Sequence, residues 1–304
     1  MKIKHKMKSS WNNTSLFGII LIAPLLLWIV ATIVYPLIRS VWMSFTDVDF
    51  LGSNSSFVGF NNYIDLIKDI EFWSAFGKSI IWTIGNALLQ VILGFATALI
   101  INQQFKGKKF VRTWIILSWI IPTIVLAIIW RWVLNSSFGI LNYILQALNL
   151  IDQPINFLGS LQMAMPTVIF INTWRWFPFL AIIVLAALQT IPADPYEAAD
   201  IDGANSLQKF IYITFPMLRP TLSVLGLIGT LWSINIFDVI YMLTRGGPAG
   251  GTETIPVFVY QKAFQEYAMN KASAAAVLLF LFLLAFVLFY IKVEPTFKEE
   301  NFLR

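Results

Sequence analysis

Three polar residues lie inside strongly apolar stretches of the chain, and they are the first candidates for chemistry. Arg175 and Asp238 carry formal charges, and Asn235 precedes Asp238 by about one helical turn. Because an ionisable side chain in lipid is costly, it usually faces a partner or a water-filled path. The carboxylate and the amide could exchange hydrogen bonds with hydroxyl groups of a solute, while aromatic side chains could stack on its apolar faces. The aromatic candidates are Trp174, Trp176, Phe179, Trp232, Phe237 and Tyr241.

A second interpretation of the same residues is structural. Polar side chains can clamp neighbouring helices together, and tryptophans gather in belts at the membrane–water interfaces. For Asn235 and Asp238, a solute path and a helix clamp both remain open. For the individual tryptophans the sequence favours the belt.

Other kinds of chemistry lack the residues that they need. The chain has no cysteine and a single histidine, His5, which lies in a lysine-rich tail. A thiolate metal site, a disulfide and a histidine-activated nucleophile are therefore unsupported. Gly77-Lys78-Ser79 resembles the end of a phosphate-binding loop, but Phe72 stands where the first glycine of that loop belongs. We expect a chain that is not an enzyme and that binds no nucleotide, metal or other cofactor itself.

The composition indicates an integral membrane protein. Of the 304 residues, 58% are hydrophobic and only 12% are charged, and the mean hydropathy is +0.73. A soluble domain carries roughly twice that share of charge, and a chain of this length could not bury so much apolar surface in water. A stretch of about 20 apolar residues can cross a bilayer as a helix. Six stretches qualify: 16–38, 79–102, 113–134, 163–192, 221–243 and 272–291.

The distribution of Lys and Arg predicts the orientation of these spans. Short cytoplasmic loops retain basic residues, and the N-terminal tail and the loop 103–112 hold many of them. We therefore expect both termini in the cytoplasm, with tails at 1–15 and 293–304 and a transmembrane domain at 16–292. Although the net charge is +5, the basic residues lie in short segments between spans, so we expect no nucleic-acid partner.

The cytoplasmic loop between the fourth and fifth spans, residues 193–220, differs from the other loops. Its residues 194–203 read D-P-Y-E-A-A-D-I-D-G. Asp194 is placed to cap the free N–H groups of a helix, and Glu197 stands where it can reach back to that cap. Gly203 can supply the left-handed turn that ends the helix. A second amphipathic piece follows, which predicts two short helices hinged at a glycine on the membrane surface.

The spacing in this loop is E-A-A-x3-G-x9-I-x-x-P, and it runs from Glu197 to Pro216. It resembles the cytoplasmic sequence that marks the permeases of ABC importers, although that family usually has leucine where this chain has Phe215. The resemblance implies that the segment is a coupling helix, which docks in a cleft of an ATPase subunit. The residues that it places at this joint are Glu197, Ala198, Ala199, Asp200, Gly203, Ile213 and Pro216.

Further segments resemble the carbohydrate branch of that family, which includes the maltose and glycerol-3-phosphate permeases. They are Gly94 to Arg112, Trp130-Arg131-Trp132, Gly139-Ile140-Leu141-Asn142, Trp174 to Phe179, and Phe237-Asp238 followed by Thr244-Arg245-Gly246-Gly247-Pro248. The resemblance implies an all-α, six-helix ABC importer type I transmembrane domain in a prokaryotic cytoplasmic membrane. This chain would form half of the translocation pore for a sugar or oligosaccharide, with the sugar route along Arg175, Trp174, Asn235, Phe237, Asp238 and Tyr241.

The resemblance also implies the partners of the chain. They are a second homologous permease subunit, two ATPase subunits that hold ATP and Mg, an extracytoplasmic solute-binding protein, the sugar and the lipid bilayer. Two other classes remain as alternatives. A self-sufficient secondary sugar transporter would show an inverted repeat, and the sequence shows no clear symmetry between its halves. A membrane-embedded enzyme would need a catalytic set, and the sequence offers none that is convincing.

Overall fold

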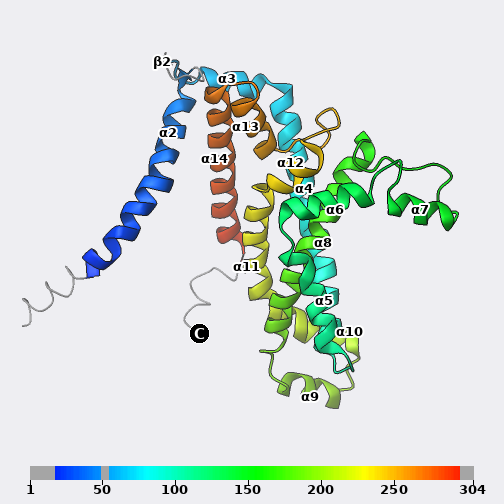
Figure 1. The fold of residues 1–304 in the computed structure, drawn as a ribbon. Coiled ribbons are helices and arrows are strands. Elements are labelled where there is room, and N and C mark those ends of the chain that lie inside the picture. Colours follow the sequence, from blue (N-terminus) through cyan, green and yellow to red (C-terminus); the bar gives the residue numbers. More distant parts are fainter. Residues whose placement is uncertain (1–17, 49–54, 295–304) are drawn as a thin grey trace, which may run out of the picture.

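The computed structural model of the chain describes residues 18–48 and 55–294. Within these ranges it is a bundle of helices with one small two-stranded sheet at one end (Figure 1). Five helices are long and apolar enough to cross a membrane, and a bent pair of helices makes up to six spans. An all-α membrane fold is therefore confirmed. His5, the predicted tail 1–15 and most of the predicted tail 293–304 lie outside the described residues.

The first span is the helix Gly18–Ser44, which contains η1 (Val30–Val34) and α2 (Tyr35–Ser44). The elements that follow are β1 (Thr46–Val48), β2 (Ser55–Phe57), α3 (Asn61–Lys68), α4 (Ile70–Asn102), α5 (Lys108–Ile120), α6 (Thr123–Val133), α7 (Ile140–Ala147), α8 (Leu161–Leu188), α9 (Asp194–Ile201), α10 (Ser206–Lys209), η2 (Phe210–Thr214), α11 (Phe215–Ile234), α12 (Asp238–Thr244), α13 (Ile255–Phe264) and α14 (Met269–Val293). The two strands pair antiparallel, with Asp47 opposite Ser56.

The third predicted span, 113–134, is not one straight helix. Helices α5 and α6 meet at an angle of 99° across Ile121 and Pro122. A proline disfavours helical backbone in the residue before it, and Ile121 is extended, with φ −63° and ψ 124°. The expectation of a continuous helix was therefore wrong at this point, and α6 begins a new direction at Thr123.

The fifth predicted span, 221–243, also has different limits. The helix runs without a break from Ser206 to Ile234, through α10, η2 and α11, and α12 is a separate short helix. At its end the main-chain N–H of Asn235 turns to the carbonyl of Trp232, while the Asn235 side chain donates to the carbonyl of Leu231 at 2.7 Å. The side-chain amide of Asn235 thus takes the carbonyl of Leu231, which the main-chain N–H of Asn235 would bind in a continuing helix, and the helix stops there.

Two helices widen by one π-helical turn just before a proline. The turn η1 precedes Pro36, and η2 precedes Pro216, each proline being the second residue after its turn. A proline inside a helix lacks an N–H group, and its ring clashes with the carbonyl four residues earlier. A π turn moves that carbonyl away from the ring, so both helices continue past their prolines.

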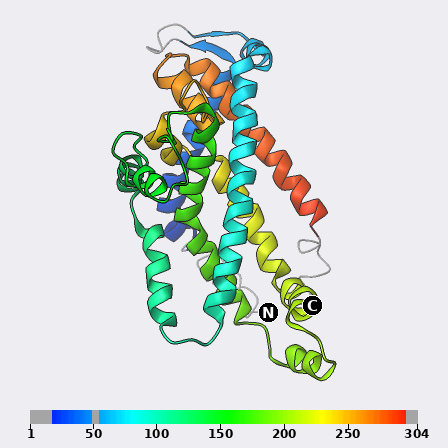
Figure 2. The same ribbon diagram turned by 90° about the vertical axis from the view of Figure 1, so that its right-hand side faces the viewer.

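Close packing of α4 against α8 forms the centre of the bundle, and the two helices run side by side in both ribbon views (Figures 1 and 2). A Cβ atom at Gly94 would overlap the side chain of Leu180 and lie 3.2 Å from the carbonyl oxygen of Phe177. Ala98, one turn further along α4, is fully buried. The spacing of Gly94 and Ala98 therefore serves contact within the chain.

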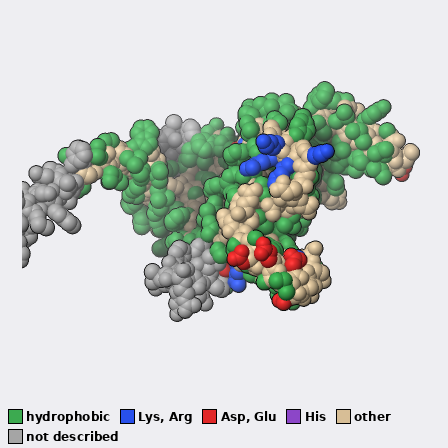
Figure 3. Space-filling view, turned by 90° about the horizontal axis from the view of Figure 1, so that it is seen from below, with side chains coloured by type: hydrophobic (Ala, Val, Ile, Leu, Met, Phe, Trp, Pro, Cys, Tyr) green, Lys and Arg blue, Asp and Glu red, His purple; other side chains and the backbone are tan. Residues whose placement is uncertain are grey.

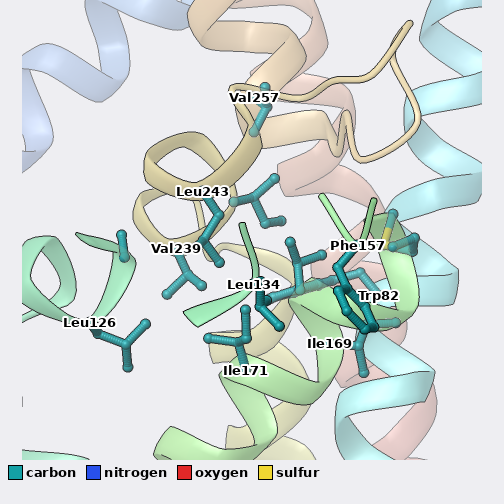
Figure 4. Close-up of a cluster of buried hydrophobic side chains, with 13 residues drawn as sticks. Trp82, Leu126, Leu134, Phe157, Ile169, Ile171, Val239, Leu243 and Val257 are labelled. Carbon is teal, nitrogen blue, oxygen red and sulfur yellow. The ribbon is translucent and has the colours of Figure 1, made fainter. Parts of the chain in front are cut away.

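Polar side chains join the same two helices. Asn172 on α8 donates to Asn86 Oδ1 on α4 at 2.6 Å, and both residues are fully buried. On the neighbouring turn, Trp82 Nε1 donates to the main-chain carbonyl of Ser233 at 2.9 Å, which ties α4 to α11. Around Trp82, apolar side chains from α6, α8, α12 and α13 pack into one cluster (Figure 4).

The first span stands apart from this bundle. None of the residues in its most apolar window is buried. Figure 1 shows it approaching the other helices only at the end that carries the sheet. There, Ser44 Oγ lies 2.6 Å from the hydroxyl of Tyr63, and Asn62 Nδ2 donates to the carbonyl of Ser44 at 2.9 Å. The helix is thus anchored at one end.

We predict that Gly94→Leu destabilises the bundle, because its side chain would force α4 and α8 apart. Overpacking of this kind costs about 1–3 kcal/mol. The measurement is thermal unfolding of the purified protein in detergent. The matched control is Gly77→Leu on the same helix, since a Cβ atom there would meet no atom within 4 Å. Equal unfolding temperatures for the two variants would contradict the assignment of Gly94 to the helix contact.

Candidate functional site

A cavity of about 220 Å³ lies between α4, α8 and α11. Its lining residues are Gln90, Trp176, Phe179, Leu180, Ile183, Leu225, Ile228, Gly229, Trp232, Ser233 and Ile236. Three aromatic rings cluster in its wall. The ring centroids of Trp176, Phe179 and Trp232 lie 6.1–6.2 Å from one another. The structure therefore brings together three of the aromatic candidates named from the sequence, from two different spans.

Polar atoms without a partner occur in the same wall. Within the described part of the chain, Trp176 Nε1 and Ser233 Oγ are buried and make no hydrogen bond. Gln90 also lines the cavity and donates to Asn86 Oδ1 at 3.3 Å. Buried polar groups are almost always hydrogen-bonded, so Trp176 Nε1 and Ser233 Oγ are two exceptions beside a cavity whose surface is mostly apolar. Gln90 and Ser233 could not be recognised from the sequence, because they are uncharged and widely separated along the chain.

Arg175 and Asp238 meet through a third residue. Arg175 Nη1 donates to Thr123 Oγ1 at 2.7 Å, and Thr123 Oγ1 donates to Asp238 Oδ2 at 2.6 Å. The charged groups themselves are 3.9 Å apart, and the side chains are 14% exposed for Arg175 and 53% exposed for Asp238. Thr123 is the first residue of α6, directly after the break at Pro122. The bridge therefore joins α8 to the bent span and to the start of α12.

This bridge lies next to the cavity wall through Arg175. The guanidinium carbon is 5.7 Å from the centroid of the Trp176 ring, a distance at which a cation is attracted to the ring face. Arg175 Nε is buried and has no hydrogen-bond partner among the described residues. The geometry thus shows a clamp between helices, and it also leaves one buried donor of Arg175 unused. Thr123 was missed from the sequence, where it is one of many hydroxyl residues.

The other predicted path residues lie elsewhere. Trp174 packs edge-on against Trp130, with centroids 5.6 Å apart, and contacts the apolar cluster around Trp82. Phe237 and Tyr241 stack on each other with ring centroids 4.9 Å apart. The ring of Tyr260 on α13 contacts Phe237 at a tilt and Tyr241 edge-on, with centroids 4.8 Å and 4.7 Å away. None of these residues, nor Asn235, lines the cavity. Their role in a sugar path stays a prediction.

The loop 193–220 contains the predicted helix, hinge and helix. Gly203, with φ +74°, lies in the left-handed region after α9, and nothing lies within 4 Å of where its Cβ would be. Tyr196 Oη lies 2.8 Å from Thr214 Oγ1, and Lys209 forms an ion pair with Asp200. These two contacts hold α9 against the base of the long Ser206–Ile234 helix.

Two details of this loop differ from the prediction. Asp194 is the first residue of α9 and its side chain makes no capping hydrogen bond, because the helix starts one residue earlier than expected, with Ala193 as its cap. A complete capping box is found instead at α10, where Asn205 and Gln208 bond to each other's main chain at 2.9 Å and 2.8 Å. The spacing N-x-x-Q could have shown this from the sequence.

The predicted joint residues are accessible. Glu197, Ala198, Asp200, Gly203 and Pro216 are exposed, and Ala199 and Ile213 are half-buried. Ile201 at the end of α9 is 88% exposed, which is unusual for a large apolar side chain at the tip of a water-facing helix. The loop therefore presents a mixed acidic and apolar surface beyond the bundle.

At the opposite end, the loop after Thr244-Arg245-Gly246-Gly247-Pro248 packs against α4. The main-chain N–H of Ile255 donates to Ser79 Oγ at 2.8 Å. Burial raises the pKa of the neighbouring Glu253 above its ordinary value of 4.5, while Lys78 opposes that shift. This end of the bundle is thus fixed to α4 by a buried hydrogen bond, next to a half-buried carboxyl group.

A multi-span bundle with an aromatic-lined cavity and a projecting charged helical loop is an arrangement that suits a membrane transport protein. Residues 90–295 match the family described as the binding-protein-dependent transport system inner membrane component, and the chain belongs to this family. The resemblance to ABC importer permeases and the location in the inner membrane are thereby confirmed.

Individual relatives agree with this assignment. The trehalose/maltose transport system permease protein MalF of Thermococcus litoralis is 36% identical, over 91% of this chain and 92% of the relative. The inner membrane ABC transporter permease protein YcjO of Escherichia coli K12 is 32% identical, over 90% of this chain and 92% of the relative. A chain of a bacterial ABC transporter involved in the import of the acidic polysaccharide alginate superposes with a TM-score of 0.83, at 25% identity, covering 98% of this chain and 100% of that chain.

We predict that Thr123→Val loosens the junction of α6, α8 and α12. The variant keeps the shape of the side chain but removes the hydroxyl that links Arg175 to Asp238, which should cost about 1–3 kcal/mol. Thermal unfolding in detergent measures the effect, and Thr123→Ser should restore stability. The matched control is Thr113→Val in the same bent span, because the Thr113 hydroxyl bonds only to the carbonyl of Lys109 in its own helix. A Thr123→Val protein as stable as the control would exclude this role.

Proposed function

We propose that the chain is one of the two permease subunits of an ATP-driven, binding-protein-dependent importer of sugars or oligosaccharides. The observation that carries the proposal is the cavity between α4, α8 and α11, where three aromatic rings adjoin unpartnered polar atoms. Aromatic faces suit the C–H faces of a sugar ring, and the polar atoms suit its hydroxyl groups. The relatives support this substrate class, since their names include trehalose/maltose and galactooligosaccharide permeases.

The proposed partners follow from the two ends of the bundle. The exposed loop 193–220 docks into an ATPase subunit through Glu197 to Gly203, and both termini lie on the same, cytoplasmic side. ATP and Mg bind to the ATPase pair, so this chain is non-catalytic and binds no cofactor. A second permease subunit completes the pore, and an extracytoplasmic binding protein delivers the sugar. A related structure contains an alginate pentasaccharide-bound periplasmic protein, which supports the last assignment.

The mechanism that we propose is alternating access through one long lever. Helix α9 is held to Lys209 and Thr214, and the helix Ser206–Ile234 continues from there to Trp232 and Ser233 in the cavity wall. Movement of α9 with the ATPase would therefore reach the cavity through these two side-chain contacts and one continuous helix. Nucleotide can shift this equilibrium only by binding one state of the complex better than the other, and α9 is where that difference enters this subunit.

We predict that Gly229→Leu blocks transport without disturbing the fold. Gly229 lines the cavity, and nothing lies within 4 Å of where its Cβ would be, so a larger side chain fills empty space. Uptake of radiolabelled sugar by proteoliposomes that contain the whole complex should fall roughly tenfold, a change equivalent to about 1.4 kcal/mol. Gly229→Ala is the matched control and should retain uptake. Full uptake by the leucine variant would remove the cavity from the sugar route.

We also predict that Gly203→Pro uncouples ATP hydrolysis from the binding protein. Proline requires a φ near −65° and cannot adopt the φ of +74° found at this position. The sugar-stimulated part of the ATPase rate of the reconstituted complex should be lost, while the spans still insert. Gly203→Asn is the matched control, because asparagine tolerates the left-handed region. Stimulated rates equal to wild type in the proline variant would contradict the coupling role.

Uptake by this chain alone, driven by an ion gradient, would favour a secondary transporter instead.

A further inference from the structure

Four basic residues cluster where α4 passes into α5. We call Lys106, Lys108, Lys109 and Arg112 the basic turn. Lys106, Lys109 and Arg112 are exposed and Lys108 is half-buried. Within residues 18–48 and 55–294, none of the four forms an ion pair. The sequence holds no Asp or Glu between Phe72 and Ile151, so no acidic residue near in sequence can neutralise them.

The basic turn lies where an apolar span ends. Helix α4 is apolar up to Ile101, and α5 becomes apolar again from Val111. The four cations therefore lie at the level where lipid hydrocarbon gives way to head groups. Helix α9 extends beyond this level, away from the bundle, in both ribbon views (Figures 1 and 2). The basic turn is thus at the membrane surface, while the proposed docking helix stands further into the water.

Exposed aromatic side chains adjoin the basic turn. Phe110 is 67% exposed and Trp114, one turn later on α5, is 61% exposed. Their ring centroids are 5.8 Å apart. Tryptophan and other aromatic residues at the ends of spans anchor them in the interfacial region of the bilayer. A cluster of cations beside exposed aromatic side chains matches the two parts of a phospholipid, the charged head group and the apolar acyl chains.

The basic turn is also separate from the acidic surface of α9. Seen from below, most of the visible Lys and Arg side chains gather in one area and most of the Asp and Glu side chains in another (Figure 3). Asp200 of α9 pairs with Lys209, which is not part of the basic turn. The positive area is therefore free to attract an anion from outside the chain.

We propose that the basic turn binds the phosphate groups of anionic phospholipids in the cytoplasmic leaflet, and thereby anchors the α4–α5 hairpin at the membrane surface. The choice of the cytoplasmic leaflet rests on the orientation given in the proposed function, whereas the lipid site itself does not depend on it. A cluster of basic residues directly beside a span is the arrangement that attracts anionic lipid surfaces. The alternative occupant is an acidic face of the ATPase subunit, which the depth of the turn disfavours.

The test compares lipid retention by the complete complex in nanodiscs made of equal parts phosphatidylglycerol and phosphatidylcholine. The variant carries Lys106→Gln, Lys108→Gln, Lys109→Gln and Arg112→Gln. Native mass spectrometry after detergent release counts the lipids that stay bound. We expect the lipids bound to the wild type to be enriched in phosphatidylglycerol. In the variant this enrichment should be at least about fivefold lower, because one basic residue near an anionic surface changes binding by roughly fivefold. Enrichment in the wild type should also fall as salt rises.

The matched control neutralises four basic residues elsewhere, Arg39, Lys68, Arg131 and Lys271, and should keep the enrichment. If the fourfold variant does not purify as a folded complex, the pair Lys106→Gln and Lys109→Gln is measured in its place. Unchanged phosphatidylglycerol enrichment in these variants would overturn the proposal. Loss of the ATPase subunits with lipid retention unchanged would assign the turn to a protein contact instead. A complex that retains lipid but never couples to an ATPase would count against the proposed function and not against the lipid site.

Discussion

The close contact of α4 with α8 is the interaction on which the other features of this protein depend. Lipid gives helices no hydrophobic reason to associate, so packing and hydrogen bonds must hold them together. Gly94 allows the approach to Leu180, and the buried pair Asn86 and Asn172 fixes its register. Since Trp82 on the same helix binds the main chain of α11, the three walls of the cavity are set by one helix surface.

The spans could be predicted from the sequence because each lipid-facing helix must be apolar along its length. Their interruptions were harder to predict. The break at Ile121 and Pro122 has a local cause that the sequence contains. The end of the fifth span does not, because it depends on the Asn235 side chain turning back to Leu231. Hydropathy is continuous there, so an apolar window cannot reveal the change of direction.

The candidate site was predicted in part. Trp176, Phe179 and Trp232, which were named from the sequence as aromatic candidates, line the cavity, whereas none of the six residues of the predicted sugar path does. Trp174 lies outside the cavity wall, because residues two positions apart on a helix point about 200° apart and Trp176 takes the inward direction. Arg175 and Asp238 are 63 positions apart in sequence, and their link through Thr123 depends on the bend of another span. Such a three-way contact requires the arrangement of helices in space. In the loop 193–220, by contrast, the glycine turn at Gly203 is local, and the sequence predicted it correctly.

The helix Gly18–Ser44 has a consequence for the order of assembly. Apart from the Asn62 amide that donates to the carbonyl of Ser44, its main-chain hydrogen bonds lie within the helix, and none of the residues in its most apolar window is buried against the rest of the described chain. It can therefore enter the bilayer as an independent stage, before the bundle that begins with α4 has been made. Its tilt relative to the bundle is then set in a later step. The contacts among Ser44, Asn62 and Tyr63 fix one end, and the surrounding lipid or protein fixes the rest. For this one span, insertion and folding are separate events.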